Sequence, residues 1–594
     1  MQTADMILSV YRERGKQGLP LERIYRQLFN PHLYLRAYAR LYPNKGALTK
    51  GSTAETADGM TLEKIDRIIN ALRSERFQWT PVRRVYIPKK QSIKLRPLGL
   101  PSWTDKLLQE VIRSLLEAYY EPQFSSLSHG FRPGHGCHTA LTTIQQTWTG
   151  TRWFIEGDLA AYFDTINHER LLAILSEDIH DERFLQLIRS LLKAGYMDGQ
   201  RTYASLSGAP QGGVLSPLLS NIYLHQLDQY VEQTLIPAHT RGIKRRSNPA
   251  YKRLSRQIAS TTNRTVEKEL RSHRRTIPSI DPYDPTYRRL QYLRYADDFV
   301  LGFVGPRAEA EEIKHHIKQW LGDQLQLELS EPKTLITHAT TQAAHFLGYE
   351  ITNQQENTKL DTAGRRTLNG TISLRIPAEV IQRRCARYSR AGKPIHRPEL
   401  LQESDYSIIT TYQQEYRGIV QYYLLASNVA ALTQLHWVMR YSLLKTLAAK
   451  YRTSSAAMVK KYRTTITGPD GKTRKCLAVQ LPREGKPPLI AYFGGIPLQR
   501  TPKAILNDQP AQVWNGRTEI LQRLLAQECE MCGAHEDIEV HHIRKLADLT
   551  KPGQQEKPAW IKRMAARQRK TLMVCRPCHE AIHAGRPTRQ PLKK

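Results

Sequence analysis

The chain has 594 residues, which is too long for one hydrophobic core and predicts about three or four domains. Its 88 Lys and Arg against 55 Asp and Glu give a formal net charge of +33 at pH 7. A surface with that charge suits a polyanion, so nucleic acid is the leading class of partner. An anionic membrane is the alternative. However, no run approaches the roughly 18 apolar residues of a spanning helix, so we expect no membrane partner.

The polar start of the sequence, residues 1–5, lacks the basic and apolar pattern of a signal peptide. We therefore expect a cytoplasmic protein. The same lack of a targeting segment favours a bacterial host over an organelle.

The N-terminal part of the chain predicts helices followed by a basic hairpin. Residues 19–47 have a helical pattern, and a polar stretch then leads into an amphipathic helix at Thr61–Arg73. A basic strand over Arg83–Lys90 and a return strand over Leu95–Pro101 predict a hairpin whose cations can reach phosphates. A solvated edge hairpin explains the same residues, and this alternative stays open.

A core helix and a buried strand come next. Apolar residues at helical spacing predict a helix over Lys106–Tyr120, and Trp153–Asp158 predicts a strand that ends in an acid. Asn167 is placed to cap the helix that follows. An Asp at the end of a central strand can face a ligand above the sheet, although Asp158 as an ordinary turn residue is the simpler alternative.

Two further segments stand out before the next acidic motif. Glycines in Gly208–Pro217 allow close approach of the backbone to a flat, polar ligand such as a nucleotide, and a long helix is predicted over Leu218–Val231. Between Arg241 and Arg275 the sequence is strongly basic and poor in apolar residues. This stretch predicts an RNA-contacting insertion at about residues 235–290, with a solvated helical excursion as the alternative.

The sequence Tyr295-Ala296-Asp297-Asp298 lies between two runs of alternating apolar residues, which predicts two short strands joined by a tight turn. Paired carboxylates bind hard divalent ions, and two such ions about 4 Å apart can bind both oxygens of a phosphoryl transfer. Asp158 could supply a third carboxylate from a second strand. An ordinary hairpin with Asp in its turn is the alternative.

Beyond residue 355 the pattern becomes helical. Helices are predicted over Pro377–Tyr388, Ser407–Tyr423 and Arg440–Lys461. From Thr464 to Gln522 Pro and Gly are frequent, and residues 487–498 predict a short strand and turns.

The last part of the chain contains two Cys-x-x-Cys pairs, Cys529 with Cys532 and Cys575 with Cys578, in a spacing typical of metal sites rather than disulfides. Four thiolates predict a closed, tetrahedral zinc site of the structural kind. His579 and His583 are four residues apart, so they share one helix face and can hold a second metal. A purely structural zinc ribbon with solvated histidines is the alternative.

Taken together, these motifs resemble those of a known family. The basic hairpin, Gly157-Asp158, residues 210–212, Tyr295–Asp298, Lys333 and His345–Tyr349 resemble the successive motifs of a reverse transcriptase. Three segments have amino-acid sequences similar to those of the proteins encoded by group II introns: Arg96–Pro101, His129–Gly134 and residues 210–217. The C-terminal Cys and His pattern resembles an HNH endonuclease.

The resemblance implies an α+β multidomain fold. A right-hand polymerase would have its fingers and palm in residues 1–360, followed by a helical thumb, or maturase domain, in residues 361–465. A DNA-binding region would follow in residues 466–525, and a small zinc-containing ββα HNH domain in residues 526–594.

The resemblance also implies roles for polymerase residues. Asp158 and Asp297 would hold two Mg²⁺ ions, with Asp298 in close support. The nucleotide-binding set would be Arg96 with Lys89 or Lys90 on the triphosphate, Phe163 excluding a ribose 2′ hydroxyl, and Gln211 aligning base and template. Lys333 would protonate the pyrophosphate, with an exposed lysine of no catalytic role as the equal alternative.

For the endonuclease, the resemblance implies that His542 activates water while His541, His579 and His583 contact a catalytic Mg²⁺ or similar ion. The four cysteines would hold Zn²⁺. One position departs from the family pattern, because Lys570-Thr571 stands where many HNH sequences have their central Asn. That departure leaves the activity of this domain in question.

The function implied is that of a group II intron reverse transcriptase and maturase. It would bind intron RNA, assist splicing, nick target DNA and copy the RNA from the exposed end, using deoxynucleoside triphosphates. A homodimer on the RNA is left open beside a monomer. One alternative is an RNA-binding splicing cofactor without an active polymerase, and another is an HNH nuclease with a degenerate polymerase. Intact Asp158, Asp297 and Asp298 argue against the first alternative, and the complete series of polymerase motifs argues against the second.

Overall fold

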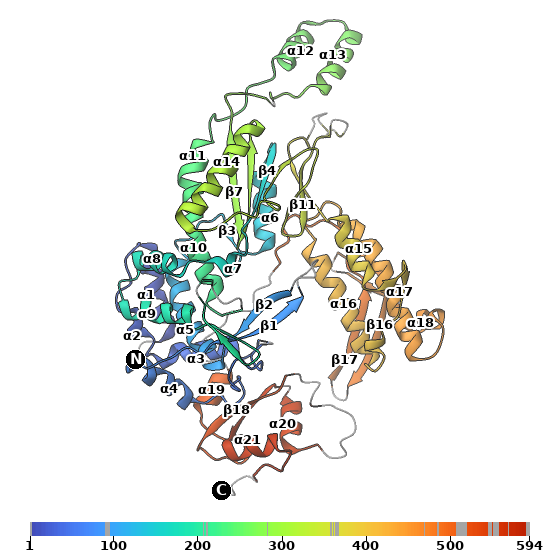
Figure 1. Ribbon diagram of the computed structural model, residues 1–594. Coiled ribbons are helices and arrows are strands. Elements are labelled where there is room, and N and C mark those ends of the chain that lie inside the picture. The colour runs from blue at the N-terminus through green and yellow to red at the C-terminus, as the bar shows by residue number, and fades with distance from the viewer. Residues whose placement is uncertain are drawn as a thin grey trace.

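The computed structural model describes residues 3–44, 46–88, 95–205, 207–208, 212–281, 283–356, 359, 362, 367–468, 470–483, 486–506, 519–544, 549, 557–567 and 569–589. Lys89, Lys90 and Gln211, three of the predicted nucleotide-binding residues, lie outside these ranges. The described chain forms an elongated, multidomain α and β structure, with its C-terminal domain beneath the N-terminal helices (Figure 1).

The N-terminal region is a group of helices around α5 (Trp103–Tyr120), which is buried along most of its length. Its partners are α1 (Ala4–Lys16) and α3 (Pro31–Leu41). The group also contains α2 (Ile24–Gln27) and α4 (Leu62–Arg73), which packs against α3. Thr61 caps α4 by accepting a hydrogen bond from the Lys64 amide at 3.0 Å. The predicted amphipathic and core helices are therefore both present.

The basic hairpin also forms, and it belongs to a larger sheet. β1 (Val82–Pro88) pairs with β2 (Leu95–Leu100) in antiparallel register, with Arg96 opposite Ile87. β5 (Tyr196–Asp198) and β6 (Arg201–Tyr203) extend it in the order β2-β1-β5-β6. Four helices lie between α5 and β5 in the chain: α6 (Cys137–Thr147), α7 (Tyr162–Thr165), α8 (His168–Asp178) and α9 (Glu182–Lys193).

A five-stranded sheet forms the centre of the structure, with strand order β3-β7-β8-β4-β9. Its strands are β3 (Ser128–His129), β4 (Trp153–Asp158), β7 (Arg289–Tyr295), β8 (Asp298–Val304) and β9 (Leu335–His338). Alternate residues enter two cores: Ile155 and Leu301 face the N-terminal one, while Phe154 and Val300 face the C-terminal one. Both faces of the sheet are therefore covered.

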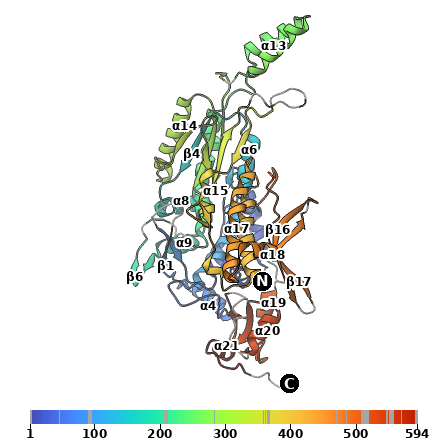
Figure 2. The same cartoon turned by 90° about the vertical axis from the view of Figure 1, so that its right-hand side faces the viewer.

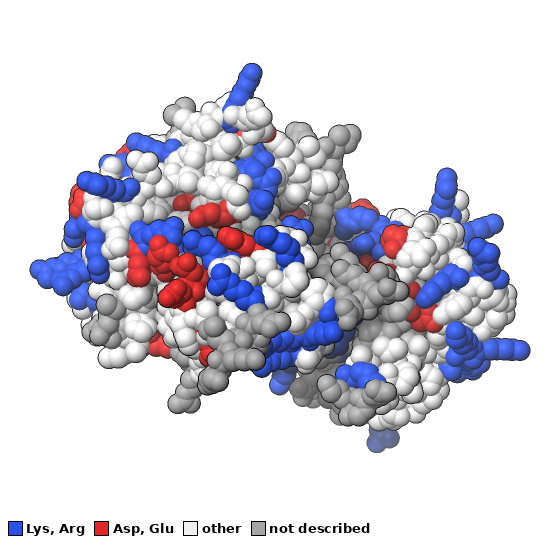
Figure 3. Space-filling view, turned by 90° about the horizontal axis from the view of Figure 1, so that it is seen from below, with Lys and Arg blue, Asp and Glu red and all other residues white. Residues whose placement is uncertain are grey.

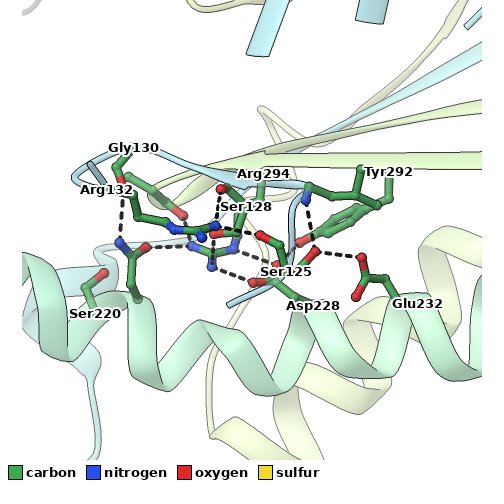
Figure 4. Close-up of polar contacts among 12 residues, drawn as sticks. Ser125, Ser128, Gly130, Arg132, Ser220, Asp228, Glu232, Tyr292 and Arg294 are labelled. Atoms are coloured by element: carbon green, nitrogen blue, oxygen red, sulfur yellow. Dashed lines mark hydrogen bonds and ion pairs between the residues drawn. The ribbon is translucent and has the colours of Figure 1, made fainter. Parts of the chain in front are cut away.

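A buried charge network joins this sheet to α10 (Ser216–Tyr230) (Figure 4). Arg294 of β7 is fully buried and forms an ion pair with Asp228 of α10 at 2.6 Å, and Tyr292 donates to the same carboxylate at 2.8 Å. Arg294 also donates to the side chains of Asn221 and Ser128, at 3.1 and 2.7 Å. A buried ion pair can repay its desolvation only when further hydrogen bonds satisfy both groups, as they do here.

The basic insertion is a helical hairpin of α12 (Pro249–Ser260) and α13 (Arg264–Thr276). It projects from the top of the molecule, beyond α11 (Ile236–Ala238) and α14 (Arg307–Trp320) (Figure 1). Leu254 is the buried residue of α12, and α13 has no buried residue. The insertion is thus a solvated helical excursion in form, with a surface dominated by cations.

The C-terminal half begins with a three-stranded sheet of β10 (Ala344–Phe346), β11 (Tyr349–Asn353) and β12 (Ile372–Arg375). Helices follow: α15 (Ala378–Ala386), α16 (Asp405–Tyr422), α17 (Thr433–Lys450) and α18 (Ser455–Tyr462). The short pair β13 (Ser389–Arg390) and β14 (Lys393–Pro394) lies between the first two of these helices.

One predicted helix is wrong in its bounds. Arg440–Lys461 is divided between α17 and α18, because Arg452 adopts a left-handed backbone with φ of 50° and Ser454 caps the second helix. A left-handed residue ends the α-helical path, and a Ser cap starts a new one.

The segment after α18 contains more strand than the sequence predicted. β15 (Arg463–Thr467), β16 (Thr473–Arg483) and β17 (Lys486–Gly494) form an antiparallel sheet that lies against α16 and α17 (Figure 2). The sheet therefore spans the expected domain boundary at residue 465.

The C-terminal domain contains α19 (Glu519–Leu525), β18 (Ile538–His542), α20 (Ala559–Arg567), β19 (Thr571–Cys575) and α21 (Arg576–His583). β18 and β19 pair antiparallel, which gives the predicted ββα unit with α21. Its apolar residues share one core with the N-terminal helices. No helix among the described residues has the length and hydropathy needed to cross a bilayer.

Replacing Asp228 by Asn should lower the free energy of unfolding by about 3–5 kcal/mol, because Arg294 is then left charged and unpaired in the interior. The measurement is urea denaturation followed by circular dichroism. Glu311→Gln is the matched control, since Glu311 is paired with Arg307 on the surface of α14 and such pairs contribute about 1 kcal/mol or less. Equal effects of the two substitutions would show that the buried pair does not organise the sheet.

Candidate catalytic centres

The three acids of the central sheet lie together. Asp158, the last residue of β4, is directly opposite Asp298, the first residue of β8. Asp297 occupies the turn that joins β7 to β8, in which Ala296 has a left-handed backbone with φ of 55°. The structure therefore brings the predicted acids together at one end of the central strands, two of them from strands and one from a turn.

Two hydrogen bonds to the Ala296 backbone hold the β7–β8 turn in place. The Ala296 amide donates to the His129 carbonyl at 3.0 Å, and the Arg294 guanidinium donates to the Ala296 carbonyl at 2.8 Å. The buried network of Arg294 and Asp228 is therefore connected directly to the backbone that carries Asp297.

Gly157, next to Asp158, permits a close approach that the sequence alone did not indicate. A Cβ on this residue would lie 2.1 Å from the ring of Phe299. An added Cβ and the Phe299 ring cannot occupy the same space, so glycine is required at residue 157 for Phe299 to pack over β4. The packing keeps β4 and β8 in the register that opposes Asp158 and Asp298.

The environment of the turn raises the pKa values of Asp297 and Asp298. Loss of water around the turn, and then the charges of Asp297 and Asp158, raise the pKa of Asp298 to about 6. Loss of water and the charge of Asp158 also raise the pKa of Asp297, although Arg96 and Lys333 oppose this rise. Carboxylates that repel one another in this way are suited to hard divalent cations, which replace the missing positive charge.

Lys333 contacts the acids directly. Its ammonium donates to an oxygen of Asp158 at 2.7 Å, while the side chain remains 59% exposed. The lysine is therefore at the acidic cluster, within reach of a group bound there.

Two of the candidate nucleotide-binding residues, Phe163 and Arg96, lie in the part of the chain that the structure describes. Phe163 of α7 is half-buried and lines a cavity of about 300 Å³ together with Arg84, Pro97 and Gly208. Arg96 is exposed on β2. Gly212, which follows Gln211, fits closely against β2, since a Cβ there would lie 2.5 Å from the Gly99 carbonyl.

The four predicted cysteine ligands cluster in the C-terminal domain. Cys529, Cys532, Cys575 and Cys578 are all buried and unoxidised, and their sulfur atoms lie within 4.8 Å of one another. Cys575 ends β19 and Cys578 lies in the first turn of α21. Four converging buried thiols fit a tetrahedral metal site.

A second cluster contains the three predicted histidines and one residue that sequence reasoning missed. His541 of β18 and His579 and His583 of α21 converge with Asp58, which precedes α4. His579 Nδ1 donates a hydrogen bond to a carboxylate oxygen of Glu539 at 2.6 Å, an arrangement typical of an oriented metal ligand. No local sequence signal marks Asp58, because it lies almost the whole chain away from its partners.

His542 lies on the opposite side of β18 from this cluster, as neighbouring residues in a strand must. Its Nε2 is 3.0 Å from the Tyr38 hydroxyl, and the side chain is only 8% exposed. Burial lowers the pKa of His542 to about 4, so the ring is neutral at pH 7. It also lines a cavity of about 720 Å³ between the N-terminal helices and the C-terminal domain, together with Lys570 and Thr571.

Comparisons with known proteins agree with this division of the chain. Residues 87–351 match the family model for reverse transcriptase (RNA-dependent DNA polymerase), and residues 379–476 match that for type II intron maturase. Residues 529–579 match the model for AI2M/AI1M-like HNH endonuclease.

The chain is 38% identical to the group II intron-encoded protein LtrA of Lactococcus lactis subsp. cremoris, over 94% of this chain and 95% of LtrA. The protein belongs to the group II intron-encoded proteins. It is also 33% identical to an uncharacterised 91 kDa protein in the cob intron of Schizosaccharomyces pombe, over 98% of this chain and 72% of that protein. Protein YkfC of Escherichia coli is 34% identical over 56% of this chain and 84% of its own length.

This group II intron-encoded protein is accordingly a reverse transcriptase and maturase with an HNH endonuclease domain, as the sequence predicted. Its reverse transcriptase and maturase domains imply binding of intron RNA and of nucleotides. Families of both enzymes use metal ions, and the acidic, cysteine and histidine clusters offer donors for them.

Mg²⁺ held by these acids would be needed at a higher concentration below about pH 6. The pKa of Asp298 is raised to about 6. Protons therefore compete with the cation for this carboxylate below pH 6 and no longer compete above pH 6. The concentration of Mg²⁺ for half-maximal primer extension should rise by up to about tenfold per pH unit below pH 6, since one proton is displaced. A requirement that stays flat from pH 7 to pH 5 would contradict this assignment.

Proposed function

We propose that the protein copies its intron RNA into DNA at a nicked target, with one centre for copying and another for nicking. The observation that carries the proposal is the register of β4 and β8, which opposes Asp158 and Asp298 beside Asp297. A polymerase without function would have no need to keep three carboxylates in a mutually repelling position. This supports an active polymerase over the alternative of a splicing cofactor alone.

The proposed domains follow the chain. The five-stranded sheet with α10 and α14 would be the palm, and the N-terminal helices with the β1–β2 sheet the fingers, within residues 1–360. The helices of residues 361–465 would be the thumb, and residues 466–525 a DNA-binding region that includes the long β16–β17 hairpin. Residues 526–594 would be the HNH domain.

In the palm, Asp158 and Asp297 would hold two Mg²⁺ ions with Asp298 in support. Bound Mg²⁺ supplies activation of the primer hydroxyl and neutralisation of the leaving pyrophosphate. Lys333, already hydrogen-bonded to Asp158, would deliver a proton to the departing oxygen. Arg96, with Lys89, would hold the triphosphate, Phe163 would exclude a 2′ hydroxyl, and Gln211 would align the base.

Binding of intron RNA would use the basic surfaces. The α12–α13 hairpin offers cations without a competing core, and Lys and Arg side chains are spread over the lower face with fewer Asp and Glu among them (Figure 3). Each phosphate contact releases counterions, so this part of the affinity would be strongly salt-dependent. One chain or a homodimer could cover the RNA.

In the HNH domain the four cysteines would hold a structural Zn²⁺, and His541, His579 and His583 a catalytic metal. His542, neutral at pH 7, is in the protonation state that a general base requires. Nicking of target DNA would then expose the 3′ end at which the palm begins. His542 would need to exchange its contact with Tyr38 for a water molecule.

Asp297→Ala should reduce extension of a DNA primer on an RNA template by about a thousandfold or more, because the carboxylate supports ions whose charge stabilisation is several kcal/mol. Binding of intron RNA and splicing assistance should persist. Asp323→Ala, at an exposed Asp in the short π-helix Leu321–Leu325, is the matched control. Extension within about tenfold of wild type would remove Asp297 from the site.

His579→Ala and His542→Ala should each abolish nicking of target DNA while sparing extension from a supplied primer, since the two centres are separate. A gel assay on end-labelled DNA measures the first activity. His535→Ala controls for loss of an exposed histidine in the same domain. Undiminished nicking by His542→Ala would exclude its role as the base without touching the role of His579.

A further inference from the structure

Asp58 lies between the three histidines of the nuclease centre. One carboxylate oxygen is 3.2 Å from His579 Nε2 and the other is 2.9 Å from His583 Nε2. His541 Nδ1 is 3.5 Å from Asp58 Oδ1, and neither ring nitrogen of this buried histidine has a hydrogen-bond partner among the described residues. A buried imidazole without partners, facing two others and a carboxylate, is the donor arrangement of a metal site.

The position of Asp58 is fixed by the backbone on either side of it. The Gly59 amide donates to the Val540 carbonyl at 3.0 Å, and the Val540 amide donates to the Met60 carbonyl at 3.1 Å. This short segment therefore adds to the edge of β18, a common way for an extended chain to bind a sheet. The His542 amide also donates to Asp58 at 2.7 Å.

The contact joins parts of the protein that are far apart in sequence. Met60 and Ala57, on either side of Asp58, are fully buried, and Tyr38 of α3 contacts His542 on the other face of β18. The N-terminal region thus contacts both functional faces of this strand: the face with the metal donors and the face with the candidate base.

We propose that Asp58 is a fourth ligand of the nuclease metal and that the N-terminal region thereby holds the endonuclease closed. The inference rests on the proposed nuclease centre. Catalytic metal sites keep one position open for water or substrate, whereas sites with four protein donors are closed. Asp58 fills the position that a DNA phosphate would need, and Tyr38 occupies the nitrogen of His542 that would activate water.

Opening then requires withdrawal of residues 58–60 from β18. The anionic phosphate of the target is chemically equivalent to the carboxylate that it replaces, since both offer oxygen donors with negative charge. His583 is 56% exposed, so the metal itself can enter from solvent while the site is closed. The metal therefore stabilises docking of the two ends of the chain until DNA competes for it.

The test is hydrogen exchange of the full-length protein, read by mass spectrometry in peptides that cover residues 57–60 and 538–542, as Mn²⁺ is titrated. The amides of Gly59, Val540 and His542 donate across the contact, so they report docking without any catalytic assay. In wild type, Mn²⁺ should slow their exchange by about tenfold or more.

Asp58→Asn should remove most of this response, because the amide retains the shape and the hydrogen bond to His542 but is a poor metal ligand. The concentration of Mn²⁺ needed for half-maximal protection should rise by at least the 10- to 100-fold that loss of even an outer ligand costs. Asp66→Asn is the matched control: the same substitution at an exposed position on α4, which should leave the response unchanged.

The outcomes separate the two proposals. A wild-type protein that neither nicks DNA with Mn²⁺ nor responds to it in exchange would overturn the nuclease metal itself, whereas Mn²⁺-dependent nicking without protection would overturn the role of Asp58. A response that His579→Ala abolishes but Asp58→Asn leaves intact would overturn the role of Asp58 while the nuclease metal stands. At saturating Mn²⁺, Asp58→Asn should nick DNA about tenfold faster than wild type, and slower nicking would overturn the closed form.

Discussion

Arg294 is buried where water cannot hydrate its charge, and the geometry of the polymerase centre depends on how that charge is satisfied. Asp228 neutralises it from α10, while Asn221, Ser128 and the Ala296 carbonyl take the remaining donors. The last of these bonds reaches the turn that carries Asp297. Removing any of the acceptors leaves a buried donor without a partner, so helix, sheet and turn are fixed together. A site that must hold three like charges close together needs this kind of support, because their repulsion would otherwise open the turn.

The same principle applies at the nuclease centre, but there the support comes from another domain. The ββα unit is small, and its apolar residues continue into the core of the N-terminal helices. A domain of this size buries little surface alone. The four cysteines and the contact with the N-terminal helices together supply the stability that the small core of this domain lacks. The proposed ligand Asp58 lies within that contact, so metal binding and domain docking become one equilibrium.

Much of the acidic cluster of the candidate polymerase centre could be predicted from the sequence, because its signals are local. Asp158 ends an apolar strand, and Asp297 and Asp298 lie between two others. The cysteine pairs and the His579–His583 spacing likewise lie in short segments. Contacts between distant segments carry no such signal: Asp58 beside His541, and Tyr38 beside His542, depend on the docking of the two ends of the chain. The break between α17 and α18 was missed for a different reason, since a left-handed Arg452 is unusual for that residue type.

A formal charge of +33 attracts every nucleic acid, because the counterions released by phosphates depend little on sequence. A protein that holds an RNA and, as proposed, cuts a DNA cannot separate these tasks by that force. Short-range contacts can separate the two tasks. A carboxylate that occupies a metal-coordination position is displaced only by a ligand that reaches the same position. An intron-encoded nuclease that stays closed by such a contact could bind its own RNA through long-range attraction and still leave it intact. On this view the Asp58 contact supplies a discrimination that the charge of the whole chain cannot supply, because the unspecific attraction acts on every nucleic acid alike.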